Sequence, residues 1–346
     1  MNRTGLILRA AIRAARPWIF RAVALVLAPI VFVGVASASD DVLDRFRKEY
    51  RQAASRLEAV SDQLRCQADF EITGLNDHTK IQKLILYKQK KILVVNHNTL
   101  LRGKKIDDAY VFCVTPEYSF QLHSQYQAGK PGPYVLRSVG LRDETSRNFL
   151  EGVSINSIHT TNQNYAIDKD RLADLLWDDH CKISQATLLP AAAGESEEAR
   201  KVELQFDNSS ANHWVGGGRL VFDPSLDWAV TEYDLDINSE APGQQTIPKG
   251  SKRLGKIVNR RWPDVGVFPE RVEYIYRYPH GDDKKVADIT AVSRDEIEDS
   301  AFTLAAYGLP DIYVRAKPRD HTVLLLLALG VGFLLVSLLL KRLSPR

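Results

Sequence analysis

The sequence predicts an α+β fold in which a large antiparallel sheet of about eleven strands dominates. Apolar and polar residues alternate with a period of two in many short segments between residues 66 and 307, as in half-buried strands. The connections between these segments are short, which favours antiparallel neighbours over crossovers. One amphipathic helix precedes the first strand, so helices form the minor part of the fold.

Residues 40–64 are predicted to form this N-terminal amphipathic helix. Ser39, Asp40 and Asp41 supply an N-cap and an acidic first turn, which suits the helix dipole. The opposite face is rich in Arg, Lys, Glu and Gln, so the apolar stripe is expected to cover a sheet. A coiled-coil or membrane-surface helix is the alternative. The apolar stripe has spacings of three and four residues and consists of Leu43, Phe46, Tyr50, Ala53, Leu57, Val60 and Leu64.

Turn residues such as Gly, Asn, Asp and Pro separate the predicted strands. In the run 271–278, three tyrosines and Val272 fall on one face, which indicates a half-buried strand. The strands are expected at 66–73, 83–88, 91–96, 109–115, 118–123, 134–139, 201–206, 218–223, 228–237, 271–278 and 301–307.

The middle of the chain interrupts this pattern with mid-chain helices. They are predicted near 143–155 and at 168–180, where Leu172, Leu175 and Leu176 form a stripe. Residues 187–200 are small, acidic and contain a proline, so they are expected to form a linker or long loop.

Three segments of the second half carry a family resemblance. Gly218-Arg219-Leu220-Val221-Phe222-Asp223-Pro224 is followed by Trp228-Ala229-Val230, and later by Phe268-Pro269-Glu270-Arg271-Val272-Glu273-Tyr274. With the element order, they resemble the superfamily of bacterial periplasmic lipoprotein carriers and sigma-factor-regulator sensors over residues 40–307. The resemblance implies a curved sheet around an apolar cavity that is covered by helices.

The N-terminus has the features of an export signal. Residues 1–39 contain five arginines and no acidic residue, and the apolar run 22–37 leads to the small residues of Ala36-Ser37-Ala38. This segment is therefore expected to be a signal peptide that is cut after Ala38 or Ser39, or an uncleaved signal anchor.

The C-terminus is predicted to hold a transmembrane helix. Residues 322–340 contain no charge, and at 1.5 Å per residue they span ~28 Å, close to a bilayer core of ~30 Å. A juxtamembrane linker at 311–321 precedes this segment, and the basic tail 341–346 follows it and is expected in the cytoplasm. The domain of residues 40–310 is then extracytoplasmic, periplasmic or at the cell surface. A C-terminal sorting signal is the alternative for this end.

The net charge of +3 comes from the two ends of the chain. Residues 40–340 carry 38 basic and 43 acidic residues, so the predicted domain is mildly acidic. A nucleic-acid partner is disfavoured because it would require a basic face on the folded domain.

Three cysteines in an exported domain cannot all pair with one another. Cys66 and Cys113 lie in predicted strands and are candidates for a cross-strand disulfide, whereas Cys181 follows a predicted helix. The alternative is that all three are buried apolar side chains. No CxxC motif occurs, and Asp178-Asp179-His180-Cys181 has neighbours that diverge on a helix, so no metal site is predicted.

No motif predicts catalysis or a cofactor. Ser154 and His159 lack a nucleophile elbow, and the glycines 216–218 precede a strand rather than a helix, so they are expected to form a hairpin turn or bulge. We therefore expect a membrane-anchored, non-enzymatic domain that binds an apolar ligand, a lipid-modified protein or an envelope partner. The alternatives are an envelope hydrolase that uses Asp178, Asp179 and His180, and a structural or assembly scaffold.

Overall fold

A computed structural model describes residues 40–60, 63–74, 78–127, 130–141, 157–191, 196, 199–238 and 247–311. The chain divides into two compact units, Met1–Phe302 and Thr303–Arg346. All the described strands belong to the first unit. In the second unit the described part contains one short 3₁₀ helix, η4 (Leu304–Tyr307), which ends at Gly308 in the left-handed conformation.

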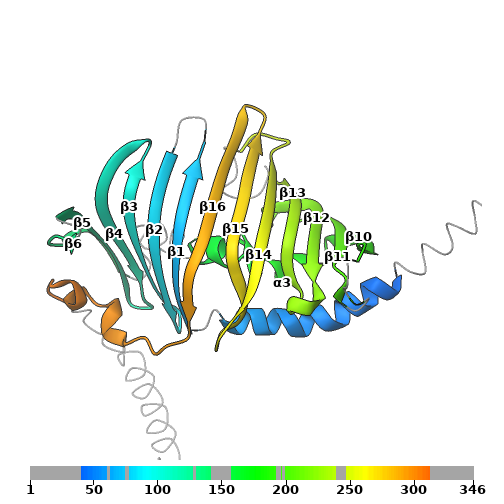
Figure 1. Cartoon of the computed structure of the whole chain (residues 1–346), viewed down its shortest axis with the longest axis horizontal. Helices are drawn as coiled ribbons and strands as arrows, with labels where there is room; N and C mark the ends of the chain where they lie inside the picture. Colours follow the sequence, from blue (N-terminus) through cyan, green and yellow to red (C-terminus); the bar gives the residue numbers. More distant parts are fainter. Residues whose placement is uncertain are drawn as a thin grey trace, which may run out of the picture. The chain divides into compact units, whose positions relative to one another are not determined.

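The first unit is built on one sheet of 14 strands (Figure 1). All its strand pairs are antiparallel, and most neighbours in the sheet are also neighbours in the sequence. The strand order is β10-β11-β12-β13-β14-β15-β16-β1-β2-β3-β4-β5-β6, with β7 also paired to β5. The first seven strands are β1 (Gln63–Thr73), β2 (His78–Lys88), β3 (Lys91–Leu101), β4 (Lys104–Val114), β5 (Tyr118–Gln127), β6 (Lys130–Pro131) and β7 (Val135–Leu141). The others are β10 (Cys181–Leu188), β11 (Val202–Asn208), β12 (Val215–Asp223), β13 (Ala229–Ile237), β14 (Lys252–Trp262), β15 (Gly266–Tyr278) and β16 (Gly281–Ser293).

The first and last strands of the sequence meet in the middle of the sheet. Pairing of β1 with β16 runs from Arg65↔Ser293 to Thr73↔Lys284, with a bulge between Gln67 and Ala68. The two seven-strand halves are therefore joined by an antiparallel ladder, which this bulge interrupts.

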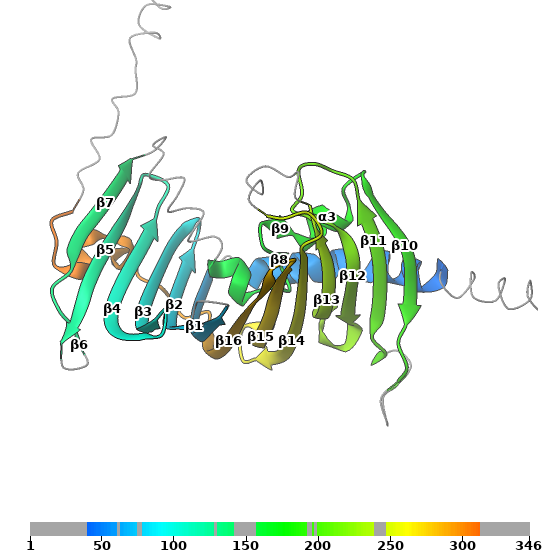
Figure 2. The same ribbon diagram turned by 90° about the horizontal axis from the view of Figure 1, so that it is seen from above.

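The N-terminal helix, residues 40–60, crosses one face of the second half (Figures 1 and 2). We call this side of the sheet the helix face. Phe46 and Tyr50 of the helix each lie about 5 Å from the ring of Phe222 on β12, at 5.0 and 5.1 Å between centroids. Of the predicted stripe, Phe46, Tyr50, Ala53, Leu57 and Val60 are buried and Leu43 is half-buried. Leu64 is also buried but lies on β1, because the described helix ends at residue 60 and not at 64 as predicted. The interpretation of this helix as a cover for the sheet is thus confirmed.

A short segment between the two halves also covers the helix face. We call residues 157–176 the covering segment. It contains a helical turn at 157–161, the two-stranded sheet of β8 (Ala166–Ile167) and β9 (Asp170–Arg171), and the helix α3 (Leu172–Leu176). Leu172, Leu175 and Leu176 of α3 are buried in the same core as the N-terminal helix.

The opposite face of the first half has its own apolar cover. The register places Leu93, Cys113 and Phe120 in one row on this face, and all three are buried. The 3₁₀ helix η3 (Asp299–Phe302) reaches this row, since the carbonyl of Phe302 accepts hydrogen bonds from the Cys113 thiol and the Tyr118 hydroxyl.

The predicted strand count of about eleven is wrong. Strands β6, β10, β14 and β16 were not predicted, and β10 enters the segment expected to be a linker. Charged residues break a simple apolar alternation in β14, whose sequence is KRLGKIVNRRW, and in the first half of β16. The run 301–307 is not a strand but two 3₁₀ turns, and the helix expected at 168–180 is only the five residues of α3. The glycines 216–218 do form a bulge, within β12.

The predicted transmembrane helix is not supported, and the fold class is corrected accordingly. Among the helices of the described residues, none is both long and apolar enough to cross a membrane. Residues 322–340, the basic tail and the predicted signal of residues 1–39 lie outside the described part of the chain, as do Ser154 and the helix expected at 143–155.

Candidate functional site

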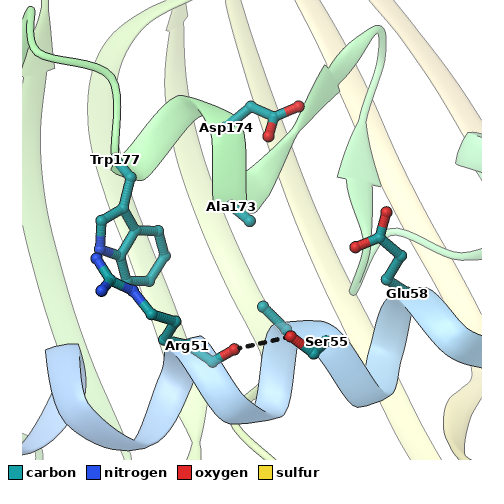
Figure 3. A pocket seen from close by; sticks show the side chains of 7 residues that line it. Arg51, Ser55, Glu58, Ala173, Asp174 and Trp177 are labelled. Atoms are coloured by element: carbon teal, nitrogen blue, oxygen red, sulfur yellow. Dashed lines mark hydrogen bonds between the residues drawn. The ribbon is translucent and has the colours of Figure 1, made fainter.

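A groove opens between the N-terminal helix and α3, with a volume of about 570 Å³ (Figure 3). Its apolar surface comes from Ala54, Ala173 and Trp177, and its polar rim comes from Arg51, Ser55, Glu58 and Asp174. The volume lies within the range of about 300–1,000 Å³ that is typical of small-molecule sites.

Trp177, which lines the groove, is part of a stack of aromatic rings. The rings of Tyr50 and Trp177 are parallel, with centroids 5.4 Å apart and an interplanar angle of 6°. Phe46 stacks on Tyr50 at 4.9 Å. Burial raises the pKa of Tyr50, so its hydroxyl stays neutral at physiological pH. The floor of the groove therefore rests on stacked aromatic rings.

The rim of the groove carries both signs of charge. The Arg51 guanidinium lies over the Trp177 ring, 5.5 Å from its centroid, and Figure 3 shows it alongside that ring. Glu58 from the helix pairs with Arg171 of β9, which also lies 3.6 Å from Asp174 of α3. Arg51 is thus the cation of the rim whose partner is an aromatic ring rather than a carboxylate.

Beneath the covering segment, a buried cluster of polar side chains fixes it to the sheet. Arg253 of β14 is 1% exposed and forms an ion pair with Asp168, which is also buried. The Asp168 carboxylate also accepts a hydrogen bond from the Tyr276 hydroxyl of β15. Removing either partner would leave a buried charge without a counter-charge, which is costly. The contact therefore holds the covering segment against β14.

Tyrosines complete the surroundings of Arg253. Its guanidinium lies 4.4 Å from the ring centroid of Tyr274 and 5.0 Å from that of Tyr276. Arg253 Nε donates to the Tyr233 hydroxyl at 3.2 Å, and this hydroxyl donates to Gln163 Oε1 at 2.7 Å. Burial raises the pKa of Tyr274 and of Tyr276 to about 12, so both rings remain neutral partners of the cation.

A glycine makes this arrangement possible. A Cβ at Gly255 would lie 2.0 Å from Cζ of Tyr233, so the tyrosine ring rests directly on the backbone of β14. This close approach places the Tyr233 hydroxyl between Arg253 and Gln163.

The residues of the predicted hydrolase alternative, Asp178, Asp179 and His180, lie in the turn between α3 and β10. Asp178 accepts a hydrogen bond from the backbone N–H of His180 at 2.7 Å and lies 3.3 Å from Nε2 of His213. The other ring nitrogen of His213 lies 3.1 Å from Asp170 Oδ1. Both ring nitrogens of His213 therefore face carboxylates. Within the described ranges, no group of three or more His, Cys, Asp and Glu side chains could hold a metal ion.

The three cysteines are free thiols. Cys66 lies on β1 and Cys113 on β4, with β2 and β3 between them, and the register places them on opposite faces of the sheet. This arrangement does not allow the predicted disulfide without movement of the backbone. Burial raises the pKa of Cys66 to about 12 and also raises that of Cys113. These two are buried as the alternative expects, whereas Cys181 is half-buried.

No family model and no curated protein matches the chain. Among solved structures, it is similar to a DUF1329 family protein from Desulfovibrio piger, with 10% identity and a TM-score of 0.38 over 75% of this chain and 98% of that one. It is also similar to a putative outer membrane lipoprotein-sorting protein domain from Vibrio parahaemolyticus, with 8% identity and a TM-score of 0.37 over 76% and 99% of the two chains. LprF from Mycobacterium bovis is a further neighbour, with 11% identity and a TM-score of 0.28 over 72% and 95%. The resemblance drawn from the sequence is matched as a weak likeness in fold. A proposal about function therefore has to be argued from the residues of this chain.

The site residues Arg51, Trp177 and Arg253 were not found by sequence reasoning. Trp177 directly follows the predicted leucine stripe of 172–176, which was a usable signal for an aromatic side chain at the helix face. A buried arginine has no such signal, because Arg253 lies among other basic residues in a strand with charges on both sides.

Proposed function

We propose that the chain is a non-enzymatic, extracytoplasmic binding domain for an amphiphilic ligand, such as the acyl chain of a lipid or of a lipid-modified protein. The observation that carries this proposal is the groove between the N-terminal helix and α3, with its apolar floor and charged rim. An acyl chain would lie along Trp177, Ala54 and Ala173, and its polar end would meet Arg51.

The energetics favour this type of ligand. Burial of apolar surface contributes about 25 cal/mol per Å², and the floor supplies such surface in a preformed state because the stack of Tyr50 and Trp177 supports it. Arg51 makes a cation–π contact worth roughly 0.5–1 kcal/mol at an exposed site, so moving it aside for an anionic group costs little.

The proposal is tested by the binding of a dansylated fatty acid to the full chain, followed by fluorescence. Ala54→Trp would fill the groove and is expected to weaken binding by about tenfold or more, whereas Ala59→Trp on the exposed side of the same helix serves as the matched control. Arg51→Ala is expected to weaken the binding of the fatty acid more than the binding of a fatty alcohol of the same length. Lys48→Ala is the control for this variant.

The proposal is overturned if the dansylated fatty acid does not bind. It is also overturned if Ala54→Trp retains the circular dichroism spectrum of the wild type and binds the probe equally well.

A further inference from the structure

A second pocket opens on the first half of the sheet, on the face opposite to the helix face. Its volume is about 330 Å³, at the lower end of the range for small-molecule sites. On β1, Ala68 and Phe70 are buried in the core of the helix face, so the alternation along the strand directs Asp69 to the opposite face. We call this the back pocket, and six of the residues that line it are Asp69, Gln82, Leu84, Val95, His97 and Tyr126.

The register arranges the pocket in two rows across neighbouring strands. Leu84 of β2 lies opposite Val95 of β3, and both are half-buried, so they form an apolar floor that retains accessible surface. Two residues along each strand, Asp69 of β1, Gln82 of β2 and His97 of β3 lie directly opposite one another. Adjacent strands are ~4.8 Å apart, so this second row spans roughly 10 Å. The pocket is therefore an apolar patch with hydrogen-bonding groups along one side.

Two stacked rings form a wall of the pocket. The rings of His97 and Tyr126 have centroids 3.9 Å apart and an interplanar angle of 6°. Ala109 of β4 lies opposite His97, and its small side chain lets the Tyr126 ring of β5 reach across β4. The imidazole is held in place because its Nε2 lies 2.5 Å from Asp107 Oδ1 and its Nδ1 lies 3.2 Å from Gln82 Oε1.

The polar row offers an acceptor beside a donor. On β16, the residue opposite Asp69 is Asp288, and the Arg271 guanidinium pairs with Asp288. Among the described residues, no cation lies within ion-pair distance of Asp69 itself. Oε1 of Gln82 is engaged with His97, which leaves the amide N–H groups of Gln82 as donors. Residues directly opposite in a sheet have Cβ atoms roughly 5 Å apart, so these two groups can meet neighbouring atoms of one ligand.

The bulge at the junction of the two halves adds uncharged polar groups. The pairs Gln67↔Ala291 and Ala68↔Ile289 leave Thr290 as the extra residue of β16. The Thr290 hydroxyl donates to the backbone carbonyl of Gln67 at 3.3 Å, and both residues line the pocket. This end of the pocket therefore presents a carboxamide and a hydroxyl.

We propose that the back pocket binds a neutral hexose unit of a saccharide. The C–H face of the sugar would lie on Leu84 and Val95 and against the stacked rings. One sugar hydroxyl would donate to the Asp69 carboxylate, and its neighbour would accept from the Gln82 amide. An acidic sugar would be repelled by Asp69. The hexose could belong to a free saccharide or to the headgroup of a glycolipid, since both present the same ring.

The experiment measures binding to the full chain by calorimetry with methyl glucoside, methyl galactoside and methyl mannoside. At least one of them is expected to bind, and to bind more tightly than methyl glucuronide. Co-sedimentation with phosphatidylcholine vesicles, with and without a glucosyl or galactosyl diacylglycerol, distinguishes the sources. Binding of the glycoside alone indicates a free saccharide, whereas binding of the glycolipid vesicles as well indicates a headgroup.

Two variants test the polar row. Asp69→Ala is expected to weaken the binding of the glycoside about tenfold or more, because it removes a charge-assisted hydrogen bond. Glu71→Ala removes the same charge from the same face of β1 outside the pocket and should leave binding unchanged. Gln82→Leu removes the amide donor at similar size and should also weaken binding. Asp69 and Gln82 are exposed, so neither variant creates a buried cavity.

The back pocket and the groove are tested separately. Asp69→Ala should bind the dansylated fatty acid like the wild type, and Ala54→Trp, which fills the groove, should bind the glycoside like the wild type. The proposal is wrong if none of the three glycosides binds, or if methyl glucuronide binds equally well. It is also wrong if Asp69→Ala and Gln82→Leu both bind the glycoside with the affinity of the wild type.

Discussion

At the scale of single residues, the buried His159 couples the stability of the fold to pH. Burial, followed by the charges of Arg171 and Arg253, lowers the pKa of His159 from 6.5 to about 4. Its Nδ1–H donates to the backbone carbonyl of Asp168, so the neutral ring is the form that fits. Between pH 6.5 and 4 the unfolded state binds more protons than the folded state, and stability therefore falls as the pH falls.

This loss should reach about 3 kcal/mol by pH 4, from 2.5 pKa units at 1.36 kcal/mol each. Urea denaturation at a series of pH values measures it. His159→Gln should flatten the pH dependence in this window, whereas His280→Gln, an exposed histidine, should leave the curve unchanged. Equal curves for wild type and His159→Gln would contradict the assignment.

At the scale of elements, the pair of Asp168 and Arg253 holds the covering segment on the sheet. Asp168→Asn keeps the left-handed backbone at this position, where φ is 56° and Asn is tolerated, but leaves Arg253 buried without a counter-charge. The variant should lose about 3–5 kcal/mol of unfolding free energy in urea denaturation. Adding Arg253→Met should recover much of the loss, because an apolar side chain needs no partner there. If the double variant is no more stable than the single one, the uncompensated charge is not the cause.

The strands differ in how well local sequence predicted them. The β15 run from Val272 to Tyr278 was found because its packed and exposed sides alternate without interruption. Strand β16 was missed because its first half, GDDKK, is charged at consecutive positions. The apolar run 301–307 was predicted as a strand but forms 3₁₀ turns, since short apolar runs do not distinguish a strand from a buried turn.

The candidate site was less predictable than the strands. The partners Asp168 and Arg253 are 85 positions apart, and no local sequence motif joins them. The groove depends on the way α3 lies beside the N-terminal helix, which periodicity alone does not determine.

At the scale of the whole first unit, the central pairing of β1 with β16 should make both halves of the sheet unfold together. Ala287 of β16 is fully buried in this junction, opposite Phe70 of β1 and Val272 of β15. Ala287→Asp places an unpaired charge there and should cost several kcal/mol. Hydrogen exchange should show equal losses of protection in β2–β3 and in β12–β13, because neither half keeps its register without the junction. Loss of protection in only one half would show instead that the two halves are separate folding units.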